Sequence, residues 1–323
     1  MRNIALISSP FQLVCFHEYV KSQQLTDYDL YIYFEGERGR VQLTTLCKLY
    51  SINNYKIIKF RKVFQYFGFL KMANKYGQIN HLIIGNLFTD SFLFFVNKTK
   101  HKKLIVLDDG INSYEIINCV ENNKRITPQS HLKKIFTKIL KLDISYPVKF
   151  NLFTIFDIKA TKKINVLKNT FSNIYSKVNN DYLVDSAYII GQPFVELNLL
   201  NKKEYNFLIE KTRENISEKN ISYIPSRKET KVNLDFLEKT HNFKILVIDL
   251  PLEIFFLMNS KPSLIIGFTS TALITLNKII LNLKLKTLVK SLKILSFQND
   301  SYSKRANLIY SVFKENKIKT VKI

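Results

Sequence analysis

The chain has 323 residues, more than one ordinary hydrophobic core accommodates, so its length favours two domains. Its 46% hydrophobic and 23% charged residues are typical of a globular protein, and no apolar window approaches the ~20 residues of a membrane span. Lys and Arg outnumber Asp and Glu by 49 to 26, and the net charge of +23 favours a polyanionic partner: nucleic acid, anionic lipid or an acidic substrate.

The first half of the chain alternates between strand and helix patterns. Residues 4–7 form an apolar run that is too short for a signal peptide and leads directly into Ser8-Ser9-Pro10, a helix start with Ser as N-cap. We expect helices over 11–20, 41–50 and 64–76, and strands over 4–7, 28–34, 55–60, 81–84 and 104–107. This alternation predicts a parallel sheet covered by helices on both faces.

Two carboxylates follow the apolar run of residues 104–107 at once. The run lacks polar alternation and is expected to be a buried strand, after which Gly110 lets the backbone turn sharply. Asp108 and Asp109 would then lie at the carboxyl end of a parallel strand, the edge where ligands bind in open α/β sheets. Their repulsion would raise the pKa of one acid, which suits a general base, but the pair equally fits a cap on the next helix.

Residues 127–164 mix basic and apolar side chains and give no assignment as a whole. Within them, residues 132–142 are sharply amphipathic, with lysines on one helical face and apolar residues on the other. The apolar face comprises Leu132, Ile135, Phe136, Ile139 and Leu140. This pattern fits a helix that lies in an anionic membrane surface, and it also fits a core-facing helix with a solvated lysine face.

A second alternating series begins near residue 185. We expect strands over 187–190, 221–224, 243–248, 263–266 and 283–289, and helices over 205–215, 251–258, 303–315 and up to about 280. The sequence therefore predicts an α/β fold of the GT-B type, in which two Rossmann-like domains, 1–175 and 176–323, face each other across a cleft. We expect the last helix to pack on the second domain, and packing on the first domain is the alternative.

Several site patterns are missing from the sequence. No GxGxxG follows a strand and no GxxxxGK[ST] is present, which disfavours dinucleotide oxidoreductases and P-loop NTPases. Three scattered cysteines fit reduced thiols in a cytosolic protein, and five histidines without HxxxH or HExxH spacing disfavour a zinc site. Because no DxD-like motif lies at the carboxyl end of a predicted strand, we expect a sugar transferase with this sequence to need no metal ion or cofactor.

Five stretches lie at the ends of predicted strands: Ile7–Leu13, Leu107–Gly110, Ile190–Glu196, Tyr223–Glu229 and Gly267–Leu273. Their order resembles that of the bacterial sialyltransferases of glycosyltransferase family 52, which act on lipooligosaccharide and capsule, and the resemblance spans nearly the whole chain. Asp108-Asp109-Gly110 matches the family's D/E-D/E-G motif, and Ser270-Thr271 matches its S-[ST] pair. The resemblance implies transfer of sialic acid from CMP-sialic acid to a galactose-type acceptor, and it implies a homodimer.

One motif departs from the family pattern. The family has His-Pro in a Y-I-P-H-P-[RK]-E context, and this chain has Ser226-Arg227 there. The resemblance assigns that histidine to the donor phosphate and to general-acid help, whereas Ser226 offers one hydrogen bond and Arg227 or Lys228 a permanent charge. Because CMP is a good leaving group, electrostatic stabilisation without a proton would suffice for its departure. Three alternatives stay open: a different donor such as a UDP-hexose, a non-catalytic relative, and a plain helix start with a solvated Arg.

The resulting hypothesis is a single inverting displacement. Asp109 takes the proton of the acceptor hydroxyl, and Asp108 either positions Asp109 or contacts the acceptor. Glu204, near a position where the family's base has also been sought, is the alternative base and equally fits a helix-start carboxylate. The residues expected to line the acceptor side are Ser9, Pro10, Gln12 and Gly110. The residues expected to bind the donor are Gly191, Gln192, Pro225, Ser226, Arg227, Lys228, Ser270 and Thr271.

Three functional classes follow from these observations. The first is a sugar transferase in the cytoplasm, bound peripherally to the inner face of the membrane through residues 132–142. The second is a nucleic-acid-binding protein, which rests on the net charge alone because no RNA- or DNA-binding module is recognisable. The third is a relative that binds a nucleotide sugar without catalysis, and only the Ser226-Arg227 departure supports it.

Overall fold

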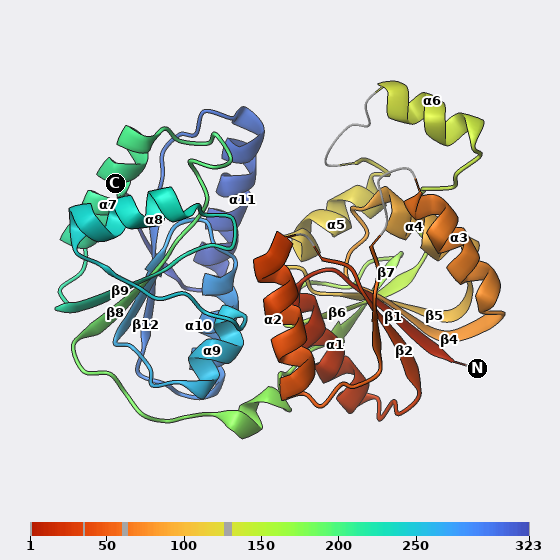
Figure 1. Cartoon of the computed structure of the whole chain (residues 1–323), viewed down its shortest axis with the longest axis horizontal. Coiled ribbons are helices and arrows are strands. Elements are labelled where there is room, and N and C mark those ends of the chain that lie inside the picture. The colour runs from red at the N-terminus through yellow and green to blue at the C-terminus, as the bar shows by residue number, and fades with distance from the viewer. Residues whose placement is uncertain (1, 35, 60–63, 126–130, 323) are drawn as a thin grey trace. The chain divides into compact units, whose positions relative to one another are not determined.

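The computed structural model describes residues 2–34, 36–59, 64–125 and 131–322 (Figure 1). It consists of two compact units, Met1–Ser176 and Lys177–Ile323. Within the described ranges, no helix is long and apolar enough to span a bilayer.

The first unit is built on a seven-stranded parallel sheet with the order β3-β2-β1-β4-β5-β6-β7. Its strands are β1 (Asn3–Ile7), β2 (Tyr28–Ile32), β3 (Tyr55–Ile57), β4 (Gln78–Ile84), β5 (Lys100–Leu107), β6 (Phe150–Thr154) and β7 (Ile164–Lys168). Its helices are α1 (Pro10–Ser22), α2 (Gly36–Leu49), α3 (Gln65–Lys75), α4 (Asp90–Lys98), α5 (Asn112–Glu121) and α6 (His131–Ile139).

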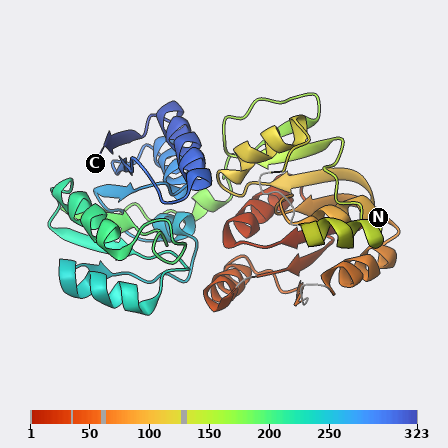
Figure 2. The same ribbon diagram turned by 90° about the horizontal axis from the view of Figure 1, so that it is seen from above.

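Helices cover both faces of this sheet, as Figures 1 and 2 show. α1 packs against α2 and against β1, while α3 packs against α4 on the other face. The central strand β1 is buried along its whole length, which explains its unbroken apolar sequence. On the side of α3, aromatic rings fill the core, and Phe69 lies edge-on to Phe92 with centroids 5.8 Å apart.

The second unit repeats this plan with a six-stranded parallel sheet of order β10-β9-β8-β11-β12-β13. Its strands are β8 (Ser186–Ile190), β9 (Asn220–Ile224), β10 (Lys244–Ile245), β11 (Leu264–Gly267), β12 (Leu288–Lys293) and β13 (Lys319–Lys322). Its helices are α7 (Lys202–Glu214), α8 (Lys231–His241), α9 (Leu252–Met258), α10 (Ala272–Asn282) and α11 (Asp300–Glu315). The last helix, α11, packs beside β13 within this unit.

Each sheet has a point at which the strand order reverses, between β1 and β4 in the first unit and between β8 and β11 in the second. In the register, Ile4 lies opposite Leu82 and Ala187 lies opposite Leu264, so the carboxyl ends of each pair lie side by side. Such switch points are where open α/β sheets bind ligands. The loops that leave β1, β4, β8 and β11 are therefore the first places to look for a site.

The expected alternating α/β pattern is confirmed, but several elements differ from the prediction. The strand expected over 243–248 is only β10, because the chain turns away after Leu246 N–H donates to the carbonyl of Tyr223. The strand expected over 283–289 begins at Leu288, because α10 runs to Asn282 and Lys284 adopts a positive φ. The helix expected from 41 begins at Gly36, and residue 60 of the expected strand 55–60 lies outside the described residues.

Candidate functional site

Asp108 lies inside the first unit, directly after β5. The residue is fully buried, and its carboxylate accepts hydrogen bonds from the Ser113 hydroxyl and the Ile155 N–H, both at 2.7 Å. Burial raises the pKa of Asp108 to about 6, and the neighbouring charge of Asp109 raises it further, against the hydrogen bonds that lower it. Asp108 thus ties the end of β5 to the end of β6 and to the start of α5, and it does not reach solvent.

Of the two acids, Asp109 is the one that lies partly exposed at the carboxyl end of the first sheet. It is half-buried, and its Oδ2 accepts a hydrogen bond of 2.7 Å from the Asn112 side-chain amide. Its Oδ1 lies 3.5 Å from the Ser9 hydroxyl, which comes from the loop after β1. Gly110 follows with φ +65°, the left-handed turn that starts the chain toward α5. A fixed, partly accessible carboxylate beside a hydroxyl can accept a proton from a bound sugar hydroxyl.

Two of the residues expected to line the acceptor side, Pro10 and Gln12, are buried and instead build the turn after β1. The Gln12 side-chain oxygen accepts from the Ser8 N–H at 2.8 Å, from the Ser8 hydroxyl at 3.0 Å and from the Ser9 N–H at 3.2 Å. The Ser9 hydroxyl in turn accepts from the Gln12 N–H, which completes a capping box. Among Ser9, Pro10 and Gln12, Ser9 is the residue that lies beside Asp109.

The raised pKa of Asp108 predicts a specific pH dependence of stability. An unfolded Asp ionises near pH 4 and the folded Asp108 near pH 6, so ionisation disfavours the folded state and stability falls as pH rises between these values. Asp108→Asn removes this dependence. We expect the free energy of unfolding of the variant, relative to wild type, to rise by about 2–3 kcal/mol from pH 4 to pH 7. Urea unfolding at both pH values checks this, and an identical pH dependence in the two proteins contradicts it.

In the second unit, Gln192 joins the two loops of the switch point. Its side-chain N–H donates to the Thr269 hydroxyl at 3.0 Å, and its side-chain oxygen accepts from the Thr269 N–H at 2.7 Å. The Thr269 hydroxyl also lies 2.9 Å from the Tyr302 hydroxyl of α11. Gln192 is half-buried, so the loop after β8 and the loop after β11 are held in one arrangement next to the surface.

Gly191 approaches a buried chain of polar groups beneath these loops. The Tyr205 and Tyr223 hydroxyls are 2.6 Å apart, and the Tyr223 hydroxyl donates to Glu229 at 2.5 Å. The second oxygen of Glu229 accepts from the Ser226 N–H at 2.5 Å. A Cβ on residue 191 would lie 2.4 Å from the Tyr223 hydroxyl oxygen and 2.6 Å from Glu229. Glycine is therefore required here by close packing.

The Ser226-Arg227 loop follows β9 and is held from below by Glu229. Pro225 and Ser226 are half-buried, whereas Arg227 and Lys228 are exposed. The Lys228 N–H lies 3.5 Å from the Ser226 hydroxyl oxygen. Two cationic side chains and one hydroxyl are thus presented at the carboxyl edge of the second sheet, an arrangement that favours an anionic group of a ligand.

Ser270 and Thr271 lie half-buried before the first turn of α10. Thr271 is the N-cap residue, and its side chain makes no capping hydrogen bond. The N–H groups and dipole of a helix N-terminus attract anions, and two hydroxyls here add donors. This place adjoins the Gln192–Thr269 contact, so Gln192, Ser270 and Thr271 belong to one edge.

The sequence reasoning missed Glu253, which lies buried in the first turn of α9. Burial raises its pKa to about 7, while a hydrogen bond from Thr275 and the charge of Arg227 lower it. The contacts join the loop after β9 to the starts of α9 and α10. In the sequence an acid two residues after Pro251 looks like an ordinary helix start, because burial by distant segments leaves no local signal.

Glu204 and Glu196 stabilise helices in this structure. Glu204 is exposed and forms a capping box with Asn201, whose N–H donates to its carboxylate at 2.7 Å. Glu196 accepts from the Thr230 N–H at 2.8 Å and from the Asn233 side chain at 2.7 Å. Among the described residues, no group of three or more His, Cys, Asp or Glu side chains is placed to hold a metal ion.

Comparison with protein families identifies the family to which this chain belongs. A family model described as alpha-2,8-polysialyltransferase (POLYST) matches residues 3–290. The chain belongs to the alpha-2,8-polysialyltransferase family. The resemblance to bacterial sialyltransferases of glycosyltransferase family 52 is thereby confirmed, and the protein is a glycosyltransferase. A comparison with curated proteins gave no match.

Solved structures show the fold of this polysialyltransferase-family chain. It is similar to an alpha/beta-galactoside alpha-2,3-sialyltransferase from Photobacterium phosphoreum, with 13% identity, a TM-score of 0.53 and coverage of 99% of this chain and 98% of that one. It is also similar to the GT-B domain of a sialyltransferase from Photobacterium damselae, with 9% identity, a TM-score of 0.51 and full coverage of both chains. A UDP-GlcNAc 2-epimerase from Methanocaldococcus jannaschii shares the fold at 12% identity and a TM-score of 0.55, over 94% of this chain and 87% of that one. The predicted GT-B fold class is confirmed.

Proposed function

We propose that this sialyltransferase-family protein transfers sialic acid from CMP-sialic acid to a surface glycan by a metal-independent, inverting displacement. The observation that carries the proposal is the carboxylate of Asp109, held beside the Ser9 hydroxyl at the carboxyl end of the first sheet. The acceptor is a galactose-type sugar in our first proposal. A terminal sialic acid is the second candidate, because the matching family model is one of alpha-2,8-polysialyltransferases.

In the proposed reaction, the first unit supplies the base. Asp109 takes the proton of the acceptor hydroxyl while that oxygen forms the new bond to the anomeric carbon of sialic acid. The bond from that carbon to the CMP phosphate oxygen breaks at the same time, and the electron pair leaves with CMP. Asp108 has no contact with solvent, so its role is to hold the turn that orients Asp109.

The second unit binds the donor in this proposal. The N-terminus of α10, with Ser270 and Thr271, and the cations Arg227 and Lys228 supply positive potential for the phosphate and the sialic acid carboxylate. Ser226 offers a hydrogen bond but no proton at neutral pH, so departure of CMP rests on electrostatic stabilisation. No cofactor takes part, and the nucleotide sugar is a co-substrate.

We also propose that the protein works peripherally on the cytoplasmic face of the membrane, as a homodimer. The support for membrane contact is α6, which has exposed apolar residues and lysines. Ile139 is 72% exposed, Ile135 is exposed as well, and so is Leu140 directly after the helix. A helix with such a face binds the interface of anionic lipids.

Nucleotide-dependent thermal stabilisation tests the donor. A ligand at 100 times its Kd stabilises a protein by about 2.7 kcal/mol, which corresponds to a rise in Tm of several degrees, roughly 5–10 °C, for units of this size. We expect this rise with CMP and CMP-sialic acid and no rise with UDP or UDP-hexoses. Stabilisation by UDP alone would indicate that the donor is a UDP-sugar and not CMP-sialic acid. Salt-sensitive RNA binding with no nucleotide effect would contradict the transferase assignment.

Transfer assays then separate the acceptors. Radiolabelled CMP-sialic acid with lactose as acceptor tests a galactose terminus, and the same donor with a sialic acid oligomer tests extension. CMP binding without transfer or donor hydrolysis would favour the non-catalytic reading that the Ser226-Arg227 departure left open.

A further inference from the structure

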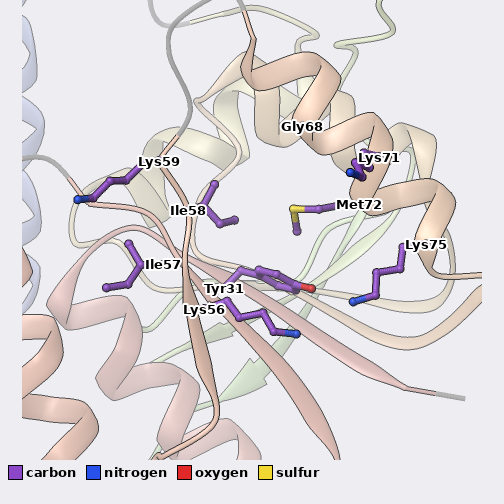
Figure 3. A pocket seen from close by; sticks show the side chains of 9 residues that line it. All are labelled: Tyr31, Lys56, Ile57, Ile58, Lys59, Gly68, Lys71, Met72 and Lys75. Atoms are coloured by element: carbon purple, nitrogen blue, oxygen red, sulfur yellow. The ribbon is translucent and has the colours of Figure 1, made fainter.

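A cavity of about 800 Å³ opens in the first unit between the edge strand β3 and α3 (Figure 3). In the sheet, β2, β1 and β4 separate β3 from β5, so the cavity is distinct from the edge that bears Asp109. Lysines and apolar side chains line it together. Among the residues that the structure describes, the cavity is lined by Tyr31, Lys56, Ile57, Ile58, Lys59, Gly68, Lys71, Met72 and Lys75.

The four lysines come from two sides of the cavity. Lys71 and Lys75 lie four residues apart on α3, and Lys56 and Lys59 come from β3 and the residues just after it. Lysines on an edge strand also deter pairing with other strands, but that role does not need lysines on the helix opposite. Like charges four residues apart destabilise a helix, so an anionic ligand is the simplest reason for Lys71 and Lys75 to share this face.

The nearby acid, Asp29, forms an ion pair with Lys56 and so offsets only part of this charge. Asp29 lies 3.7 Å from the Lys56 ammonium, but it is also 3.2 Å from Arg2 and accepts a hydrogen bond of 2.9 Å from Tyr76. None of the described residues that line the cavity is acidic. Figure 3 shows the Lys56 and Lys75 side chains reaching toward the Tyr31 ring, with Met72 pointing between the two walls. The cavity therefore combines an apolar interior with a basic rim.

The surface beside the cavity is aromatic and exposed. Phe64 and Phe67, at the start of α3, are 65% and 57% exposed. α3 also contacts α6, because the Tyr66 and Phe136 rings lie 6.1 Å apart. A soluble polyanion gains little from exposed phenylalanines, whereas the bilayer interface takes up aromatic rings next to basic residues.

We propose that this cavity binds the phosphate headgroup of an anionic phospholipid and docks the first unit on the membrane. Lys56, Lys71 and Lys75 surround the phosphate, and the glycerol and first methylenes contact Ile58 and Met72. Phe64 and Phe67 enter the interface beside the lipid. This site acts independently of the transfer reaction, so its test does not depend on the identity of the donor.

Vesicle sedimentation tests the proposal with the whole chain. We expect wild type to bind vesicles of phosphatidylcholine that contain phosphatidylglycerol, and not vesicles of phosphatidylcholine alone. Lys71→Gln/Lys75→Gln should lower the partition coefficient roughly 30-fold, since each basic residue near an anionic bilayer contributes about fivefold. The matched control, Lys202→Gln/Lys203→Gln, removes the same charge from the exposed start of α7 and should leave binding nearly unchanged. Phe67→Ser should weaken binding with no change of charge.

Three outcomes would overturn the headgroup site. In the first, both lysine pairs lower binding equally, which means that only net charge matters. In the second, the α3 pair binds as wild type does. In the third, a soluble sialic acid oligomer, and not the vesicle, binds in a way that needs Lys71 and Lys75. Transfer to a soluble acceptor without vesicles should be equal in wild type and the α3 variant, so a failure of the proposed transfer reaction is seen separately.

Discussion

Asp109→Asn is expected to lower the rate of sialic acid transfer by about 10²–10⁴-fold, the range typical of a lost general base. The substitution keeps the shape of the side chain, and the amide oxygen still accepts from Asn112, so the turn after β5 stays in place. The proposed donor groups belong to the second unit, so KM for CMP-sialic acid should change little while kcat falls. Steady-state kinetics with a soluble acceptor, together with donor hydrolysis, measure both quantities.

Glu204→Gln is the control for Asp109→Asn, because Glu204 was the alternative base. Its carboxylate caps α7 and accepts from the Gln298 side chain at 3.0 Å. We expect its loss to lower stability by about 1 kcal/mol or less and to leave kcat within a few-fold of wild type. Full activity of Asp109→Asn, combined with an inactive Glu204→Gln, would place the base on α7 and refute the mechanism.

Patterns that depend on neighbours in sequence predicted the central elements of both sheets. β1, β8 and β11, and the second half of β5, are buried on both faces, so each gives an apolar run that ends in polar or glycine residues. The switch-point loops follow from the ends of these strands. The sequence alone therefore predicts Asp109, Gln192 and Ser270 at the carboxyl edges of the two sheets.

Elements without a clear period were missed. α4 is buried at every position from Asp90 to Val96, so no polar face marks it as a helix. β6 and β7 are short and carry polar residues, and β7 lies at the edge of its sheet. β13 is a four-residue edge strand rich in lysine, so its sequence is equally typical of a solvated chain terminus.

The roles of single polar residues were the hardest to predict, because they depend on contacts far apart in sequence. Gln12 looks like a free amide after a helix start, yet the close approach of Gly85 leaves it buried, with its oxygen on the Ser8-Ser9 turn. Glu229 matched a family motif, but its use as an acceptor for Tyr223 and Ser226 appears only in the fold. The sequence located the edges, and the fold decided which side chains reach the surface there.

Gly191→Ala is expected to remove donor binding and to destabilise the second unit by about 2–5 kcal/mol, since it overpacks a buried site and breaks a buried polar chain. The new methyl would lie 2.4 Å from the Tyr223 hydroxyl oxygen, so Tyr223 and Glu229 must move apart. Glu229 would then lose the Ser226 N–H, and the loop that carries Arg227 and Lys228 would shift. Urea unfolding and the CMP-induced rise in Tm measure the two effects.

Gly77→Ala is the matched control for Gly191→Ala, because a Cβ on residue 77 meets no atom within 4 Å. It should leave both the unfolding transition and the response to CMP close to wild type. Adding Tyr223→Phe to Gly191→Ala removes the oxygen that the methyl meets, so part of the lost stability should return. If Gly191→Ala instead binds CMP as wild type does, Glu229 does not hold the Ser226 loop in place for the donor. The Ser226-Arg227 loop would then not need the buried hydrogen bonds of Tyr223 and Glu229. In that case the N-terminus of α10 alone would have to bind the phosphate.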